Sequence, residues 1–323
     1  MQHFIDLAVG NLVSPAVLFF AMGVAAALAR AELSIPEAIA KTLALYLMMA
    51  IGFKGGVEVA KSGLTIDLVS AMLAGILLSS LLPAIGFWLL RTTTKLDAVN
   101  AAAIAAHYGS ISIVTFIAAT QTLQALGVGF EGYMIAVAAV METPAILVAL
   151  VLAGQSGGGH KSRGKLWHEV TLNASVVMLV GSFLIGWATG EAGAAQVKPF
   201  LVDIFRGVLC LFLLDMGLVA GRGLRNGFRA LQPSVLAFGL YMPLLSACLA
   251  ALLCYGLGLS TGAAALLITL AASASYIAVP AAMRLALPEA QPSLYLTLSL
   301  AVTFPFNLSV GIPIYLWLAE QVS

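Results

Sequence analysis

Long apolar runs, separated by short stretches that contain Gly, Pro or charged residues, dominate the chain from one end to the other. A helix needs about 20 mostly apolar residues to cross the hydrocarbon core of a bilayer, and ten runs approach that length. The pattern therefore predicts an all-α polytopic membrane protein with ten transmembrane helices. The predicted spans cover residues 14–30, 36–53, 67–90, 97–125, 131–153, 168–190, 197–220, 233–258, 262–287 and 293–319.

The one obvious hydrophilic linker, GQSGGGHKSRGK at residues 154–165, divides the chain into five predicted spans before it and five after it. Residues 1–153 and 166–323 therefore form two halves. Because five is an odd number, the second half starts on the opposite side of the membrane from the first. Any homology between the halves would make an inverted-topology repeat, which is the plan of many secondary transporters.

Three landmarks recur in the same order in both halves. Gly56 and Pro144 are 88 residues apart, and so are Gly217 and Pro305. Gly and Pro are common in membrane helices, so a chance match is the competing explanation, but the equal spacing and the odd span count favour a true repeat. The first half carries Gly55-Gly56, Ser110-Ile111-Ser112 and Glu142-Thr143-Pro144, and the second carries Met216-Gly217, Ser273-Ala274-Ser275 and Thr303-Phe304-Pro305.

The fourth and ninth predicted spans are interrupted by small and polar residues near their centres. Gly109 weakens the helix before the first serine pair, and Pro280 follows the second pair and cannot donate a backbone hydrogen bond. We therefore expect both helices to be broken at mid-membrane. A broken helix offers backbone N–H groups to an anion and carbonyls to a cation such as Na⁺, and serine hydroxyls both donate and accept. The alternative is that these small residues only let helices pack closely.

Composition agrees with a membrane location and argues against several functions. Of the 323 residues, 61% are hydrophobic and 9% are charged, against about 25% charged in a soluble domain. A net charge of +1 argues against nucleic-acid binding, which needs a basic face. The three cysteines lie in apolar runs without metal-ligand spacing, so we expect packing roles for them, no transition metal and no cofactor. The lipid bilayer is the expected partner along most of the chain.

Lys and Arg residues are distributed unequally between the loops on the two sides of the predicted spans. The basic side is the cytoplasmic side by the positive-inside rule, which places the linker in the cytoplasm and both termini outside. The N-terminal sequence lacks the basic region that begins a signal peptide, so no cleavage is expected. The basic side carries Arg30, Arg91, Lys95, Lys161, Arg163, Lys165, Arg222, Arg225, Arg229 and Arg284, and the other side carries Lys54, Lys61 and Lys198.

Glu142 and Asp215 are the clearest ionisable residues inside predicted spans, and His107 and the uncharged Asn307 join them. Ionisable groups are costly there and usually face a cavity or a partner. Glu142 and Asn307 flank the two repeated prolines, and we interpret them either as cation-site groups or as structural hydrogen-bond partners between helices. Asp215 lies near a span end, within reach of the basic side. His107 could relay protons, although a histidine satisfied by a neighbouring carbonyl is the more common case.

These residues resemble those of a known family, the sodium-dependent bicarbonate transporters first described in cyanobacteria. The stretch Tyr108-Gly-Ser-Ile-Ser-Ile-Val-Thr-Phe116 looks like that family's Phe-Gly-Ala-Val-Ser-Gly-Ser-Thr-Met, and AASASYIAVPAAMRLALP at 271–288 looks like its AASSSDISGPPTLRAGIP. Glu142 takes the place of an acidic residue before the family's Ile-Pro, and residues 311–313 also align without gaps. The resemblance covers nearly the whole chain and is dense at both interrupted spans.

The resemblance implies two inverted five-span repeats whose core and gate subdomains interleave, with the core moving against the gate by alternating access. It implies bicarbonate import coupled to sodium, in a homotrimer of the bacterial cytoplasmic (inner) membrane, with a PII-like cytoplasmic regulator as a further partner. Carried over by position, the substrate-binding residues would be Gly109, Ser110, Ser112, Ile113, Val114, Thr115, Ser275 and Tyr276. The residues that bind the coupling Na⁺ would be Ser273, Ser275, Thr303, Asn307 and Glu142.

The chain departs from the family at both motifs. Ile113 and Val114 replace a Gly and a Ser, while Ala278 and Val279 replace a Ser and a Gly. Tyr276 replaces an acidic residue, which removes a carboxylate from the sodium motif. Backbone donors survive side-chain changes, so the departures affect cation coupling more than anion binding. The cytoplasmic linker is also shorter than that of the cyanobacterial members.

Three other functions are alternatives. A carrier of another small anion such as a monocarboxylate, coupled to protons through His107 and Glu142, would use Ile113, Val114 and Tyr276 as apolar contacts. An intramembrane enzyme would need a nucleophile–base pair or a metal site, and the chain has neither an HExxH motif nor an identifiable third partner for His107 and Ser112, so no enzyme is expected. A channel would show polar pore-lining stripes rather than paired broken helices.

Overall fold

The computed structural model describes residues 14–63, 65–155, 174–227, 231–276, 279–280, 283 and 287–323. All regular elements within these ranges are helices, as the apolar pattern predicts. Seven helical segments of the described residues are long and apolar enough to cross a membrane, and the chain is therefore a helical, multi-pass membrane protein. These segments are Glu37–Lys61, Ile66–Thr93, Ala98–Ala125, Met134–Ala153, Phe205–Arg225, Pro233–Leu257 and Pro292–Val322.

Polar caps explain where several helices begin. The side chains of Ser14, Thr65, Asp97, Ser112 and Ser260 each accept a hydrogen bond from a backbone N–H in the first turn of the helix that follows, which satisfies a donor that the helix cannot. The first half contains α2 (Pro15–Leu28), α3 (Glu37–Ser62), α4 (Ile66–Thr93), α5 (Ala98–Gly109), α6 (Ile113–Ala125) and α7 (Met134–Gln155). The second half contains α9 (Ala174–Lys198), α10 (Phe205–Gly227), α11 (Pro233–Leu257), α12 (Thr261–Ala272), α14 (Pro292–Thr297), α15 (Phe304–Phe306) and α16 (Ile312–Val322).

Glycines mark helix ends less often than the sequence interpretation assumed. The predicted span 36–53 was wrong at its end, because α3 continues through Gly55-Gly56 to Ser62. The predicted span 168–190 starts outside the described residues, and its helix passes a kink at Gly190 (φ 57°) and continues to Lys198. The first predicted span coincides with the shorter apolar helix α2, whereas α12 covers only the first part of the ninth predicted span, 262–287.

The last span is one continuous helical segment that contains two π-helical stretches, Leu298–Thr303 and Asn307–Gly311. Pro305 and Pro313 lie within this segment and donate no backbone hydrogen bond. A wider turn accommodates a missing donor, and π-turns are frequent at functional sites. Thr303 ends the first stretch and Asn307 begins the second, so both predicted cation-site residues of this span stand at a change of helical pitch.

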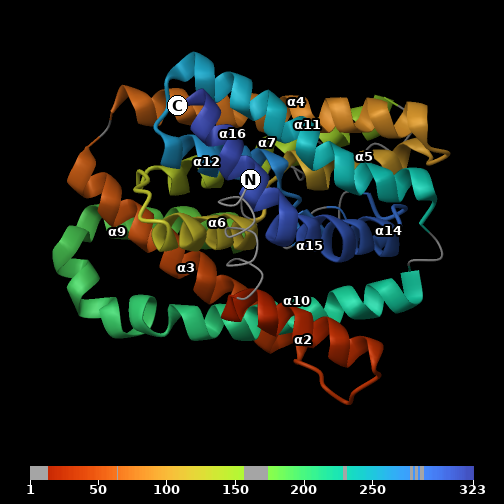
Figure 1. The fold of residues 1–323 in the computed structure, drawn as a ribbon, viewed down its shortest axis with the longest axis horizontal. Coiled ribbons are helices and arrows are strands. Elements are labelled where there is room, and N and C mark those ends of the chain that lie inside the picture. The colour runs from red at the N-terminus through yellow and green to blue at the C-terminus, as the bar shows by residue number, and fades with distance from the viewer. Residues whose placement is uncertain are drawn as a thin grey trace.

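The helices form two layers, and in Figure 1 α2 and α10 lie on the opposite side of the molecule from α4 and α11. The four-helix layer consists of α2, α3, α9 and α10, in which α3 packs along α9 and α2 packs along α10. The main layer contains the remaining helices, with α4 packed on α5 and α7, and α11 packed on α12 and α16. The layers meet where α3 contacts α7 and where α10 contacts the last helical segment. Both interrupted spans therefore belong to the main layer.

Glycines bring α3 and α9 together backbone to backbone. A Cβ atom at Gly56 would collide with the carbonyl oxygen of Phe183, and a Cβ atom at Gly186 would collide with the carbonyl oxygen of Phe53. Small residues allow this close approach between membrane helices. Gly56 therefore has a packing role, which explains why a glycine stands in the middle of α3.

The contact between α2 and α10 has the same construction. A Cβ atom at Gly217 would collide with the carbonyl oxygen of Phe20, and a Cβ atom at Gly23 would collide with the carbonyl oxygen of Leu214. Each of the two helix pairs in the four-helix layer is thus joined by a reciprocal pair of glycine–carbonyl contacts.

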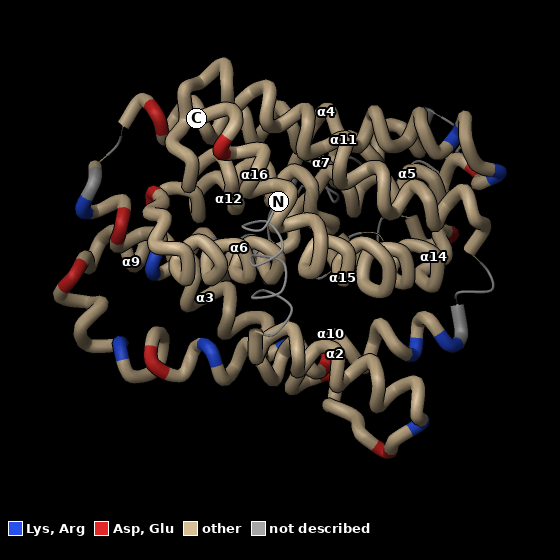
Figure 2. The backbone as a smooth tube through the Cα atoms, viewed as in Figure 1, with Lys and Arg blue, Asp and Glu red and all other residues tan. Residues whose placement is uncertain are grey.

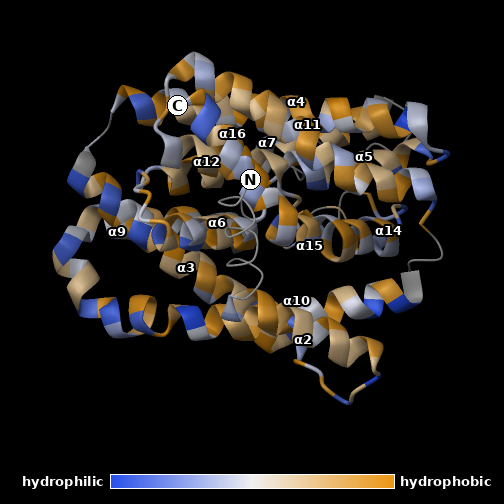
Figure 3. Ribbon diagram, viewed as in Figure 1, coloured by the Kyte–Doolittle hydropathy of each residue, from blue (hydrophilic) through white to orange (hydrophobic). Residues whose placement is uncertain are grey.

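Charged residues gather toward the ends of the bundle, and its middle is apolar (Figures 2 and 3). The end at which α4 and α10 finish carries basic residues, including Arg91 and Arg225 in their last turns. Large apolar side chains are exposed along the outer faces of α4 and α11, among them Leu73 (62% exposed) and Leu252 (69% exposed). Contiguous apolar surface of this kind is suited to lipid contact.

The end of α2 has an unusual backbone. The N–H of Ala31 donates to Ala26 O at 2.9 Å and the N–H of Arg30 donates to Ala27 O at 3.3 Å, a Schellman arrangement in which the left-handed position is normally glycine. Arg30 occupies that position with φ 60°. A non-glycine residue in this conformation costs about 1–2 kcal/mol.

Candidate functional site

Two interrupted helices of the main layer meet at the centre of the molecule. Helix α5 ends at Gly109 and α6 begins at Ile113, while α12 ends at Ala272. Ser110, Ser112 and Ser273 have extended backbone conformations between or after these helices. The position of Gly109 requires glycine, because a Cβ atom there would collide with the ring of Pro83 in α4. The break in the ninth span lies before Ser273 and not at Pro280, which stands in helical backbone after it.

Hydrogen bonds in both directions join the two interruptions. The N–H of Ser112 donates to Ser273 Oγ at 2.8 Å, and the N–H of Ser275 donates to the carbonyl oxygen of His107 at 2.7 Å. All of these residues are buried. A buried backbone N–H without a partner is costly. Ser273 satisfies a donor of the first interruption, and His107 in the last turn of α5 satisfies a donor of the second, so the two interruptions fix one another's position.

Ser112 also organises the start of α6. Its hydroxyl oxygen accepts from the N–H of Thr115 at 3.2 Å and from the Thr115 hydroxyl at 2.9 Å. The N–H groups of Ile113 and Val114 belong to the first turn and have no acceptor within the helix. We call the place where residues 110–112 and 273–275 meet the crossing. The positive end of the α6 dipole therefore lies at the crossing, together with the negative ends of α5 and α12.

A small cavity of about 10 Å³ lies beside the crossing, and Glu142 contributes the one carboxylate among the residues that line it. Glu142 comes from α7 and is 3% exposed, and its Oε2 atom has no hydrogen-bond partner among the described residues. A volume of this size accommodates about one water-sized sphere. The cavity is lined by Met48, Ile111, Ser112, Ile113, Glu142, Ser275 and Tyr276.

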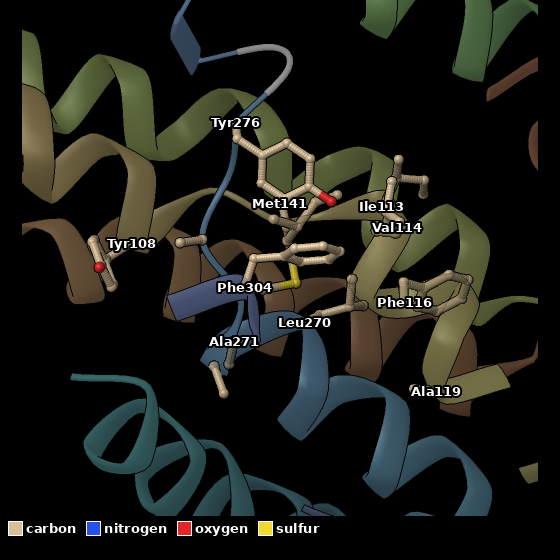
Figure 4. Close-up of a cluster of buried hydrophobic side chains, with 14 of the residues drawn as sticks. Tyr108, Ile113, Val114, Phe116, Ala119, Met141, Leu270, Ala271, Tyr276 and Phe304 are labelled. Atoms are coloured by element: carbon tan, nitrogen blue, oxygen red, sulfur yellow. The ribbon is translucent and has the colours of Figure 1, made fainter. Parts of the chain in front are cut away.

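Tyr276 forms one wall of this cavity. Its ring packs edge to face on Phe304, with ring centroids 5.2 Å apart, and its hydroxyl is directed toward Ile113 (Figure 4). Met48 lies on the opposite side of the layer boundary, in α3. The four-helix layer thus contributes a side chain to a cavity whose other walls belong to the main layer.

The last helical segment contacts the helices around the crossing through Thr303 and Asn307, which stand at its two π-helical stretches. Asn307 Nδ2 donates to Ala272 O at 3.0 Å, and Asn307 Oδ1 accepts from the hydroxyl of Tyr315 at 2.6 Å. Thr303 Oγ1 donates to Gly239 O at 2.7 Å and lies 2.5 Å from the hydroxyl of Tyr108. Asn307 is therefore joined directly to the end of α12, whereas Thr303 is joined to α5 and α11.

The structure brings some of the predicted site residues together and separates others. Ser112, Ile113, Ser275, Tyr276 and Glu142 line the same cavity. Ser273 and Thr115 contact Ser112, and Gly109 and Ser110 end α5 beside it. Val114 instead lines a separate cavity of about 360 Å³ that is bounded by α2, α6 and α10, and Thr303 does not line the small cavity.

The other polar residues inside the spans have structural partners. His107 Nδ1 lies 2.6 Å from Ala103 O, one turn earlier in α5, and the imidazole stacks on Tyr295 with centroids 4.5 Å apart. Asp215 is buried in α10 and is attracted by the charge of Arg222. Within the described residues no group of three or more His, Cys, Asp or Glu side chains could hold a metal ion.

Sequence reasoning missed Met48, Tyr108 and Tyr315 as parts of this region. Met48 and Tyr315 stand in apolar stretches where they look like any other packing residue. Tyr108 adjoins the first serine motif, and its position next to a helix break was the one available signal. Its bond partner Thr303 is 195 residues away, so the contact depends on the fold.

The fold and the crossing define a multi-pass helical membrane protein with a buried polar site between interrupted helices. A sequence profile of the Na⁺-dependent bicarbonate transporter superfamily matches residues 15–320 of the chain. The match covers the helices described above except for the last two residues of α16, and the chain belongs to this superfamily. No match was found among curated proteins.

Proposed function

We propose that the protein is a secondary active transporter that imports bicarbonate together with Na⁺ by alternating access. One observation carries the proposal: in a chain of the bicarbonate transporter superfamily, one helix N-terminus and two helix C-termini meet at a buried cavity that holds serines and a carboxylate. Such a crossing offers separate places to an anion and a cation.

The repeat architecture that alternating access requires is supported by the packing of the four-helix layer. Gly56 contacts Phe183 and Gly217 contacts Phe20. In the proposed repeat, Gly56 of the first half corresponds to Gly217 of the second, and Phe20 of the first half corresponds to Phe183 of the second. The two contacts are therefore equivalent. We therefore propose ten spans in two inverted repeats, 1–153 and 166–323, with the four-helix layer as the gate and the main layer as the core. Helices α5–α6 would be the fourth span, and α12 would begin the ninth.

The anion is proposed to bind at the start of α6. A planar oxyanion would accept hydrogen bonds from the first-turn N–H groups of Ile113 and Val114. The hydroxyls of Ser112 and Thr115 can also donate to it. The α6 dipole favours negative charge at this end. Gly109, Ser110, Ser275 and Tyr276 complete the proposed surround from the two extended segments. The two bulky residues Ile113 and Tyr276 give the site one apolar wall.

The cation is proposed to bind at the side of Glu142. Na⁺ prefers oxygen ligands, and the carbonyls that end α5 and α12 supply partial negative charge. Glu142 lines the same cavity as Tyr276, and it is the carboxylate that remains for a cation there, since position 276 has none. Ser273, Ser275, Thr303 and Asn307 are the further proposed ligands; all four form internal hydrogen bonds in this conformation and would exchange partners on binding.

The described conformation is proposed to be a closed one. A bicarbonate ion needs more room than a cavity of about 10 Å³, and binding therefore requires Met48 and the four-helix layer to move away from the main layer. The reciprocal glycine contacts hold each helix pair of the four-helix layer together, so we expect this layer to move as a unit.

The surroundings of the protein follow from the same proposal. We expect a homotrimer in a bacterial inner membrane, with both termini outside and a PII-like regulator acting from the cytoplasm. The concentration of arginines at the ends of α4 and α10 supports this orientation through the positive-inside rule.

A second substrate is favoured by the wall that Ile113 and Tyr276 form. A short monocarboxylate has a carboxylate for the start of α6 and an apolar group for this wall, whereas bicarbonate has no apolar group. Proton coupling in this alternative would use Glu142. His107 is already held by Ala103 O and is less suited to that role.

The deciding experiment measures uptake of isotopically labelled bicarbonate into proteoliposomes under an inward Na⁺ gradient, with K⁺ replacing Na⁺ in the parallel sample. Uptake that requires Na⁺ supports the proposal. Uptake indifferent to Na⁺ would retain the anion and assign coupling to protons. No uptake by folded protein would overturn the substrate, and labelled acetate under a proton gradient would then test the alternative.

A further inference from the structure

A second concave site lies away from the crossing, where the end of α2 faces the end of α10. Its volume is about 440 Å³, and half of the residues that line it are arginines. None of these residues takes part in the proposed transport site. The pocket is lined by Ala27, Arg30, Ala31, Leu33, Arg222 and Arg225.

The arginines of α10 are oriented by contacts to the neighbouring chain segment. Arg222 Nη2 donates to Leu33 O at 3.1 Å, and Arg225 Nη1 donates to Ala27 O at 3.2 Å. A guanidinium group has five N–H donors in a planar fork that matches phosphate oxygens. The carbonyl contacts hold the guanidinium groups of Arg222 and Arg225 at one pocket. Arg30 supplies a third guanidinium group.

No ion pair within the described residues joins Arg30 or Arg222 to a carboxylate. Asp215, two turns earlier on α10, attracts Arg222 from a distance, and Glu32 is the one acidic residue in the loop that follows α2. Arg30, Arg222 and Arg225 thus bring three guanidinium groups to the lining of one pocket.

Arg30 stands at this pocket in a backbone conformation that favours glycine, with φ 60° at the left-handed position after α2. Glycine would form the same helix end without strain. Strained residues occur where a side chain has a task, and the side chain of Arg30 lines the pocket.

The pocket also lies beside apolar surface at the end of a membrane helix. Leu28 is 50% exposed and Leu33 is 39% exposed, and both flank Arg30 in the sequence. Arginines at the basic ends of membrane helices stand at the depth of lipid headgroups. A ligand of this place would have a phosphate for the arginines and hydrocarbon for the leucines.

We propose that this pocket binds the phosphate of an anionic phospholipid of the basic-side leaflet and thereby holds the ends of α2 and α10 together. A lipid phosphate and a soluble phosphate both present anionic oxygens that the guanidinium groups can bind. The exposed leucines assign the ligand to the lipid.

The test compares binding of phosphatidylglycerol and phosphatidylcholine with the same acyl chains to the purified full-length protein, by native mass spectrometry and by thermal unfolding in detergent. Each arginine near the headgroups is expected to favour the anionic lipid about fivefold. Phosphatidylglycerol should bind preferentially and raise the unfolding temperature of the native protein. Arg30→Gly should lower the preference about fivefold and yet unfold at no lower temperature without lipid, because glycine suits that backbone.

Arg222→Gln combined with Arg225→Gln should remove most of the remaining preference. Arg91→Gln is the matched control, because Arg91 also stands at the basic end but donates to Leu96 O in the main layer. An unchanged lipid preference in Arg30→Gly and in the double variant would overturn the proposal. Equal protection by inorganic phosphate would overturn the lipid assignment in favour of a soluble anion, and a loss of subunit association in place of lipid would assign the pocket to a second copy of the chain.

Discussion

The amide N–H of Ser112 donates to the hydroxyl oxygen of Ser273 at 2.8 Å, across 161 positions of sequence. The Ser273 hydroxyl in turn donates to Leu270 O at 2.8 Å, one turn back in α12. The start of α6 is thereby connected to the end of α12 by a directed chain of hydrogen bonds. The four predictions below concern this crossing, the packing of the four-helix layer and the cap of α5.

Ser273→Ala should destabilise the protein, because it leaves the buried N–H of Ser112 without an acceptor. The expected loss is about 1–3 kcal/mol, seen as a lower unfolding temperature in detergent. Ser299→Ala is the control: Ser299 is also fully buried, but its hydroxyl donates only within its own helical segment, to Tyr295 O and Leu296 O. Equal losses from the two substitutions would contradict a special role for the Ser112–Ser273 bond.

Glu142→Gln should keep the fold and abolish the Na⁺ dependence of uptake in proteoliposomes, because glutamine retains the shape of the side chain without its negative charge. Glu131→Gln serves as the control, since Glu131 is a carboxylate at a helix end that accepts from Ser260 Oγ at 2.8 Å. Sodium-dependent uptake at the native rate in Glu142→Gln would place the cation elsewhere.

Gly56→Ala and Gly217→Ala should each lower the stability of the four-helix layer by about 1–3 kcal/mol, because the added methyl group meets a backbone carbonyl that cannot rotate away. Gly207→Ala has open space around its Cβ position and should be neutral or stabilising by up to about 1 kcal/mol. Thermal unfolding of the three variants separates these outcomes, and tolerance of both tight substitutions would argue against backbone contact between the helix pairs.

Asp97 should give α5 a pH-dependent stability in the acidic range. Burial raises the pKa of its carboxyl, but hydrogen bonds from the N–H and the side-chain amide of Asn100, at 2.8 and 2.6 Å, outweigh burial and hold the pKa below its usual value of 3.8. A group with a lowered folded-state pKa stabilises the protein above its unfolded pKa, and this contribution is lost as the pH falls through the folded value.

Thermal unfolding between neutral pH and about pH 3 tests this prediction against the reference pKa of Asp. Asp97→Asn should lose less stability than the native protein on acidification, because asparagine caps a helix without titrating. Identical pH profiles for the two proteins would show that the Asp97 cap does not titrate in this range.

The interruption of the fourth span was predictable from sequence, because Gly109 and the serines around it are poor helix formers in a long apolar run. The exact end of the ninth span's first half was not predictable, since Pro280 is a stronger local signal than Ser273. Gly55-Gly56 led to the prediction of a helix end where the helix continues. A glycine that ends a helix and a glycine that packs against a neighbouring backbone look the same in sequence until the neighbour is known.

The candidate site was predictable to the extent that it depends on local motifs. The serine pairs, Glu142 and Asn307 are visible in the sequence, and the structure places each of them at or beside the crossing. Met48 and Tyr315 reach the same region from α3 and α16, and no pattern in their own segments distinguishes them from lipid-facing or core residues. Thr303 holds the position of Glu142 in the proposed repeat, yet its partners are Gly239 and Tyr108.

The small volume beside the crossing has a consequence for the energy balance of a cell. A space of about 10 Å³ is at the lower limit for one water molecule, and a single water cannot form the connected file along which protons hop. We therefore expect that the cavity beside the interlocked serine segments does not conduct protons along a file of waters in this conformation. A protein that returns through such a state between substrates would leave the proton gradient of its membrane intact, however many copies the membrane contains.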